Sequence, residues 1–174
     1  MTRIRLGFPT VKTLFAFPNP VNEYSARLVA AGVVLLTLLY LGTGSGWVLA
    51  VIVWGFVARV LTGPTLSPLG QIVTRWITPW LESRLGRSGP RVPGPPKRFA
   101  QGIGATLAIV AVGLHLLGPS WAALAAVGAI TFAATLESAF GICLGCIIFG
   151  WLMRIGLIPA RACEACTNFS PGAA

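Results

Sequence analysis

The sequence predicts an all-α, polytopic membrane protein, and three observations lead to that fold class. The chain has 174 residues, of which 55% are hydrophobic and 10% are charged, whereas about 25% of an average soluble domain is charged. Its mean hydropathy is +0.81, and its many Gly and Pro residues are typical of transmembrane helices. Finally, most of its basic side chains lie between long apolar segments rather than within them.

Four apolar segments are candidates for transmembrane helices, each of which needs about 20 residues to cross a bilayer. They cover residues 27–41, 46–61, 99–117 and 120–136. The first two are short and need flanking residues to reach a full span. The turns at 42–46 and 118–120 are short and uncharged, so the four segments are expected to form two tight helical hairpins.

The distribution of Lys and Arg predicts the orientation of these helices. Residues 1–27 hold four basic side chains and residues 63–98 hold six, while the two turns hold none. By the positive-inside rule, we expect a multi-pass protein of the cell membrane with a cytoplasmic N-terminus. The first 20 residues contain three prolines and no run of seven apolar residues, so a cleaved signal peptide is not expected.

An internal repeat is visible at an offset of 74 to 75 residues. Residues 18–26 match residues 93–101, Tyr40 aligns with His115, and the stretch 69–77 matches 144–152. The expected organisation is a cytoplasmic N-terminal segment (1–17), a single membrane domain (18–166) and a frayed C-terminus (167–174). Within the membrane domain we expect repeat one (18–81), a basic linker (82–92), repeat two (93–158) and a tail containing cysteines (159–166).

Each repeat is expected to end in a third, amphipathic helix at the membrane interface. Between residues 69 and 80 apolar side chains recur at helical spacing, which is typical of a helix with one apolar face. The counterpart at 144–157 is apolar around more of its circumference, so a spanning helix is the alternative. The interfacial position is favoured because Arg154 falls within this helix and Arg161 would otherwise be exported.

All four cysteines belong to two CxxC pairs, Cys143 with Cys146 and Cys163 with Cys166. Sixteen residues separate the pairs, a spacing typical of a four-thiolate zinc site. A thiol redox or sulfur-transfer pair is the competing interpretation. The repeat alignment places Cys143 just before a helix and Cys146 in its first turn, where unpaired backbone amides favour a thiolate. Glu137, six residues upstream of Cys143, is a weak candidate for a proton acceptor.

Other polar residues have simpler explanations. Arg59 lies near the cytoplasmic end of the second apolar segment and Glu137 directly follows the fourth. We expect Arg59 to extend toward the interface and Glu137 to lie at an interfacial helix end, with a role in a transport pathway as the alternative. His115 is the single histidine and is expected at the outer interface. The net charge of +9 does not indicate nucleic acid binding, because the basic residues flank apolar segments instead of forming one soluble basic face.

Three strings, at residues 17–27, 96–104 and 140–146, resemble an actinobacteria-rich family of small membrane proteins, the domain of unknown function 4395. The resemblance covers most of residues 17–166, and both CxxC pairs look like part of that family's pattern. The family implies no settled activity, so no catalytic residue follows from it.

The leading functional hypothesis is a membrane-bound dithiol that exchanges electrons or sulfane sulfur with a cytoplasmic thiol or sulfurtransferase-type protein. The alternative is a non-catalytic membrane scaffold in which Cys143, Cys146, Cys163 and Cys166 bind structural zinc. We expect the protein to contact the lipid bilayer and not to bind nucleic acid. The sequence indicates neither an oligomeric state nor whether the protein is an enzyme.

Overall fold

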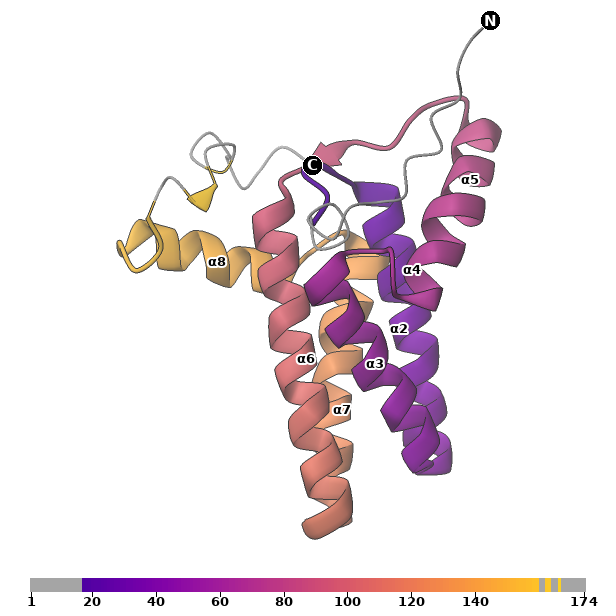
Figure 1. The fold of residues 1–174 in the computed structure, drawn as a ribbon, viewed down its shortest axis with the longest axis vertical. Helices are drawn as coiled ribbons and strands as arrows, with labels where there is room; N and C mark the ends of the chain where they lie inside the picture. The colour runs from indigo at the N-terminus through magenta and orange to yellow at the C-terminus, as the bar shows by residue number, and fades with distance from the viewer. Residues whose placement is uncertain (1–16, 160–161, 164–165, 167–174) are drawn as a thin grey trace, which may run out of the picture.

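The computed structural model describes residues 17–159, 162–163 and 166. The predicted frayed segment 167–174 and residues 1–16 of the predicted N-terminal segment lie outside this part. The described chain is predominantly helical, as predicted. Four long helices run side by side along the long axis of the molecule (Figure 1). They are α2 (Glu23–Thr43), α3 (Gly46–Thr62), α6 (Gly94–Leu117) and α7 (Ser120–Thr135), which continues into the π-helix η2 (Leu136–Phe140).

The core of this four-helix bundle contains small side chains where the helices approach one another. Ala105, Ala108 and Ala111 form a buried stripe on α6, and α6 contacts both α3 and α7. On the same helix, a Cβ at Gly104 would lie 2.3 Å from the Phe56 ring of α3. Small residues at such crossings let helix backbones come close together, as in membrane helix pairs.

Among the residues that the structure describes, three helical stretches are long and apolar enough to cross a membrane: α2, α6 and the continuous segment Ser120–Phe140. Helix α3 is apolar but shorter, with 17 residues. Helix α6 begins at Gly94, five residues before the predicted start. Pro95 and Pro96 fall in its first turn, where the missing N–H groups would have had no intrahelical partner.

The third helix of the first predicted repeat forms as one rod with an internal π turn: α4 (Pro68–Ile72), η1 (Val73–Ile77) and α5 (Thr78–Leu85). Pro79 has no N–H to donate to Arg75, which explains why the helix widens there. The outward side chains Ile72, Trp76 and Trp80 are exposed. Thr78, which lies opposite the apolar stripe in the helical periodicity of residues 69–80, is buried and shares a hydrogen bond with Ser25 at 2.9 Å.

The third helix of the second predicted repeat is α8 (Leu144–Arg154), which lies across one end of the bundle (Figure 1). We refer to this end as the α8 end. With 11 residues, α8 is about 16 Å long, too short to cross a hydrocarbon core of about 30 Å. Ile147, Ile148 and Trp151 are exposed on it, so α8 has the dimensions and the apolar face of an interfacial helix.

The linker between the predicted repeats is not uniformly extended. Residues 82–85 belong to α5, and β2 (Arg91–Val92) pairs antiparallel with β1 (Val21–Asn22), a two-stranded sheet that the sequence did not predict. The Asn22 side chain caps α2 by accepting the Tyr24 N–H at 2.9 Å. It also donates to Glu82 at 2.8 Å. These contacts attach the linker to the start of α2.

Candidate functional site

Helix α8 positions the first cysteine pair. Cys143 is the N-cap of the helix, and its Sγ accepts the backbone N–H of Cys146 at 3.3 Å. This is the placement that the repeat alignment predicted. Cys143 is 8% exposed and Cys146 is half-buried; both are free thiols. A sulfur atom at a helix N-cap lies against unpaired amides that stabilise negative charge.

Close packing against α6 holds the start of α8 in place. A Cβ at Gly145 would lie 2.4 Å from the Cβ of Ala100 and 2.5 Å from its Cα, so glycine permits an approach that alanine would block. One turn further along α8, the Phe149 ring packs edge to face on Phe99 with 5.5 Å between ring centroids. The position of the two thiols therefore depends on backbone contact between α8 and α6.

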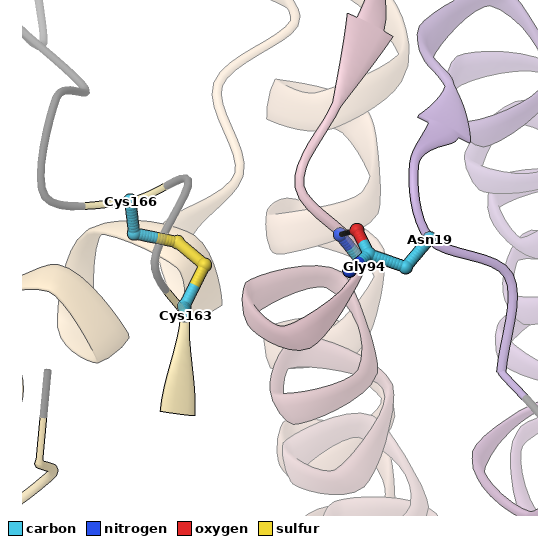
Figure 2. Close-up of a disulfide and its surroundings, with 4 residues drawn as sticks. All are labelled: Asn19, Gly94, Cys163 and Cys166. Carbon is cyan, nitrogen blue, oxygen red and sulfur yellow. Dashed lines mark hydrogen bonds between the residues drawn. A yellow bond between two sulfur atoms is a disulfide. The ribbon is translucent and has the colours of Figure 1, made fainter. Parts of the chain in front are cut away.

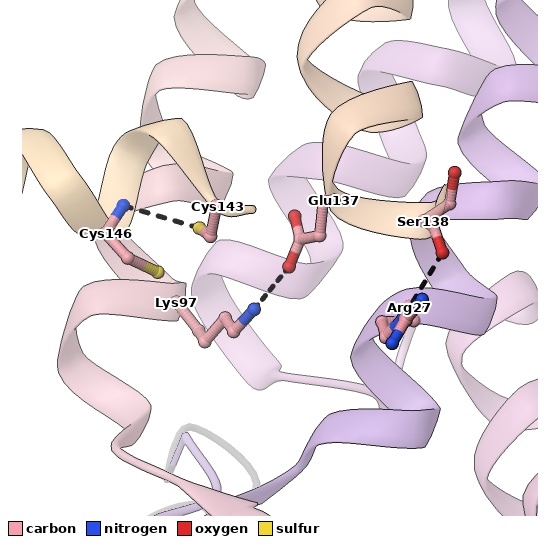
Figure 3. Close-up of polar contacts among 6 residues, drawn as sticks. All are labelled: Arg27, Lys97, Glu137, Ser138, Cys143 and Cys146. Carbon is pink, nitrogen blue, oxygen red and sulfur yellow. Dashed lines mark hydrogen bonds and ion pairs between the residues drawn. The ribbon is translucent and has the colours of Figure 1, made fainter. Parts of the chain in front are cut away.

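An ion pair lies beside the thiols. Lys97, in the first turns of α6, donates to Glu137 of η2 at 2.5 Å, and both side chains are largely buried, at 12% and 14% exposure. Figure 3 shows Lys97 reaching between the cysteines and Glu137. Glu137, the predicted proton acceptor, thus lies in the same cluster as Cys143 and Cys146. We call these four residues the thiol cluster.

Sequence reasoning counted Lys97 only as one of the basic flanking residues and did not connect it with the cysteines. Lys97 and Glu137 are 40 residues apart, and nothing in their local sequence links them. One signal was available: Lys97 precedes the second hairpin and Glu137 follows it, and the two ends of a helical hairpin meet on the same side. A basic and an acidic side chain at these ends are candidates for an ion pair.

The two thiols of the cluster have different acidities. The pKa of Cys143 is lowered, chiefly by a hydrogen bond that the Cys146 thiol donates to it; burial and Glu137 oppose this effect, while Lys97 and the Cys146 N–H contribute to it. The pKa of Cys146 is raised, first because it donates that bond and then because it is buried. Cys143 is therefore the favoured thiolate, and Cys146 the favoured proton carrier.

Arg27 fixes the turn that carries Glu137. Its guanidinium donates to the carbonyls of Ser138 at 3.2 Å and Ala139 at 2.7 Å, the first of which appears in Figure 3. Carbonyls at a helix C-terminus lack intrahelical partners, so the Arg27 cation satisfies them directly. Gly141, in the left-handed conformation with φ 72°, then ends η2 and leads the chain into Cys143.

Arg59 was predicted to extend toward the interface, and this prediction is wrong. It is 5% exposed and donates to Gln101 at 2.9 Å and to Ser67 at 3.3 Å, while its guanidinium lies 4.7 Å from the centre of the Phe56 ring. These partners come from α3, α6 and the residue that precedes α4, and no feature of the sequence indicated that they would meet. Arg59 links the first predicted repeat to the second near the α8 end.

The second cysteine pair differs from the first. Cys163 and Cys166 form a disulfide with 5.2 Å between their Cα atoms (Figure 2). In the described part of the chain, no group of three or more His, Cys, Asp or Glu residues is arranged to hold a metal ion. The four-thiolate zinc site stays a prediction, and what the described residues contain is a dithiol and a disulfide.

Residues 21–154 match the model of a protein family described as a domain of unknown function, DUF4395. The chain belongs to this family. The DUF4395 match runs from β1 to the last residue of α8 and so includes the whole thiol cluster. It ends before Cys163, whereas the resemblance had led us to expect both CxxC pairs within it. No curated protein and no solved structure matches the chain.

Proposed function

We propose that this DUF4395 protein spans the cell membrane four times, as two tandem helical hairpins, with its N-terminus in the cytoplasm. The lengths and apolar character of α2, α6 and Ser120–Phe140 support three of the spans, and α3 pairs with α6 across the bundle. Ten basic residues on one side of the hairpins and none in their turns support a cytoplasmic α8 end. In this orientation the thiol cluster faces the cytoplasm.

Two contacts support the duplication. The Tyr40 hydroxyl hydrogen-bonds His115 Nδ1 at 3.1 Å, and Asn19 Oδ1 accepts the Gly94 N–H at 3.0 Å (Figure 2). Each pair is 75 residues apart and joins positions that the repeat alignment makes equivalent. Equivalent positions touch one another only near a symmetry axis, so these contacts are expected if two repeats are related by a pseudo-two-fold axis along the membrane normal.

The proposed activity is thiol exchange: Cys143 and Cys146 pass electrons, or sulfane sulfur, to or from a soluble cytoplasmic protein. The observation that carries the proposal is the asymmetry of the pair, in which one sulfur at a helix N-cap accepts hydrogen bonds beside a lysine while its neighbour holds a proton. A nucleophilic thiolate with an adjacent resolving thiol is the arrangement that disulfide exchange requires.

The exchange step conserves atoms and electrons. The Cys143 thiolate attacks one sulfur of a partner disulfide, forming a mixed disulfide and releasing the other partner sulfur as a thiolate. Cys146 then gives its proton to that thiolate and attacks Cys143, releasing the second partner thiolate and leaving a Cys143–Cys146 disulfide. Two electrons have moved from this protein to the partner. With a partner persulfide, Cys143 would instead take the terminal sulfur and release a partner thiolate.

The pH dependence of alkylation tests this proposal. In purified protein, Cys143 should react with iodoacetamide at a rate that stays high below the ordinary thiol pKa of about 8.5. Cys146→Ser keeps a hydroxyl donor beside Cys143 and should preserve the profile, whereas Cys146→Ala removes the donor and should shift it to higher pH. If Cys143 titrates like an ordinary thiol in all three proteins, the proposed function loses its physical basis.

A further inference from the structure

The two CxxC pairs occupy different redox states, one as thiols and one as a disulfide. We infer that they form an internal relay. The thiol cluster reduces the Cys163–Cys166 disulfide, and the reduced tail pair then passes the two electrons to the soluble partner protein. This inference rests on the proposed thiol exchange at Cys143 and adds a second cysteine pair of the same chain as its immediate partner. Both pairs lie at the α8 end of the molecule: the thiols are at the start of α8, and Figure 2 shows the disulfide in one view with Gly94 at the start of α6.

The burial of Cys143 limits which disulfides can reach it, and this explains the use of a second cysteine pair in the same chain. Cys143 is buried against α6 and η2, next to the Lys97–Glu137 ion pair (Figure 3). Disulfide exchange requires the attacking sulfur to approach the target sulfur along the S–S axis, and at a buried thiol a narrow segment of the same chain makes this approach more readily than a folded partner does. A two-cysteine segment of the same chain is narrow enough to approach, and Cys166 is only half-buried.

The chain after α8 turns back toward the bundle. The N–H groups of Leu157 and Ile158 both donate to the carbonyl of Leu152, at 3.0 and 3.3 Å, and Gly156 takes the left-handed conformation with φ 80°. Such a turn ends the helix and reverses the chain. In Figure 1 the described yellow pieces of the tail lie back over the length of α8 instead of beyond its far end.

The length of the tail is sufficient for contact. From Cys143 at its N-cap to Arg154, α8 runs for about 16 Å at 1.5 Å per residue. The turn at residues 155–158 keeps its hydrogen bonds to Leu152, and the five residues 159–163 after it can span about 16 Å at 3.3 Å per residue, which matches the length of α8. The tail can therefore bring its disulfide back to Cys143 without any unfolding of α8. Disulfides in the reducing cytoplasm are usually transient and catalytic, which fits a relay better than a structural clamp.

The relay step balances within the chain. The Cys143 thiolate attacks Cys166, a Cys143–Cys166 disulfide forms, and Cys163 leaves as a thiolate. Cys146 gives its proton to Cys163 and attacks Cys143, so Cys166 leaves as a thiolate. The products are a Cys143–Cys146 disulfide and a reduced tail pair, which passes two electrons to a disulfide of the soluble partner.

The relay is tested by trapping its intermediate in the full-length protein in detergent. In Cys146→Ser the only thiol that can resolve the Cys143–Cys166 disulfide is Cys163, which re-forms the tail disulfide, so rapid thiol blocking should trap both forms at their equilibrium ratio. Trypsin cuts after Arg98, Arg154 and Arg161, which places the two pairs on separate peptides, 99–154 and 162–174. Mass spectrometry after thiol blocking should find these peptides joined by a disulfide, in an amount that does not change on dilution.

The matched control is Cys143→Ser, which leaves only the less acidic thiol of the cluster. The relay predicts about tenfold more joined peptide in Cys146→Ser than in this control, because the thiolate is the attacking species. Equal amounts in the two variants, or none in either, would overturn the relay.

A second measurement separates failure of the relay from failure of the proposed function. A triple variant, Cys146→Ser with both tail cysteines changed to Ser, is treated with glutathione disulfide. Rapid glutathionylation of Cys143 without any joined peptide in Cys146→Ser refutes the relay and leaves thiol exchange in place. Absence of both reactions refutes the relay and the proposed function together.

Discussion

The contact between Gly145 and Ala100 makes the clearest prediction about how the thiol cluster is held. Adding a Cβ by Gly145→Ala creates contacts of 2.4 and 2.5 Å with atoms of Ala100, whereas carbon atoms pack at about 3.5 to 4.0 Å. The Ala100 side chain has no rotamer to change and its Cα belongs to α6. Helix α8 must therefore move away from α6 by about 1 Å or more, and it carries Cys143 and Cys146 away from Lys97.

The expected cost follows from overpacking, about 1 to 3 kcal/mol, less up to about 1 kcal/mol gained in helix propensity. For a chain of this size, each kcal/mol lowers Tm by roughly 2 to 4 °C. Thermal unfolding in detergent should show this loss, and alkylation of Cys143 near neutral pH should slow. Gly150→Ala is the control on the same helix, because a Cβ there meets nothing within 4 Å. The reasoning is refuted if both variants match the unmodified protein in Tm and in Cys143 reactivity.

Three further predictions concern the charges, the sidedness and the metal content of the site. Lys97→Met should slow alkylation of Cys143 several-fold at neutral pH and Glu137→Gln should accelerate it, because the ammonium lowers and the carboxylate raises the pKa of Cys143; the same direction in both variants would contradict this electrostatic account. A membrane-impermeant maleimide should label Cys143 and Cys146 only after intact cells are permeabilised, and labelling from outside would reverse the proposed orientation. Metal analysis of purified protein should find well under one zinc per chain; stoichiometric zinc that is lost together with thermal stability in Cys143→Ser would favour the structural zinc site instead.

Hydropathy predicted the long helices because apolar length is a property of the local sequence. The helix boundaries differ from the predicted ones where local rules compete, as at the start of α6. Pro95 and Pro96 there are typical of a linker, but they also fit the first turn of a helix. The N-cap position of Cys143 was also predictable, since the alignment with the first repeat placed a helix start there. Capping depends on a few neighbouring residues, so the repeat carried that information.

Contacts between residues that are far apart in the sequence could not be predicted from it. The ion pair of Lys97 with Glu137 and the hydrogen bond of Arg59 with Gln101 join residues 40 and 42 positions apart. They depend on how α3, α6 and α7 rotate about their axes when they pack. A single sequence specifies that rotation only through the combined shape of many side chains. The apolar stripe of residues 69–80 shows the same limit, because its periodicity predicted the helix but not that Thr78 would face inward.

The most direct test of the account is a redox titration of the thiol cluster. The full-length protein in liposomes would be equilibrated with mixtures of reduced and oxidised glutathione and quenched, and the state of Cys143 and Cys146 read from tryptic peptide 99–154. We expect reversible, two-electron conversion between a dithiol and a Cys143–Cys146 disulfide, with Cys143 the first thiol to react. Cysteines that stay reduced at every glutathione ratio, or that oxidise without returning on reduction, would contradict the claim that this pair exchanges electrons.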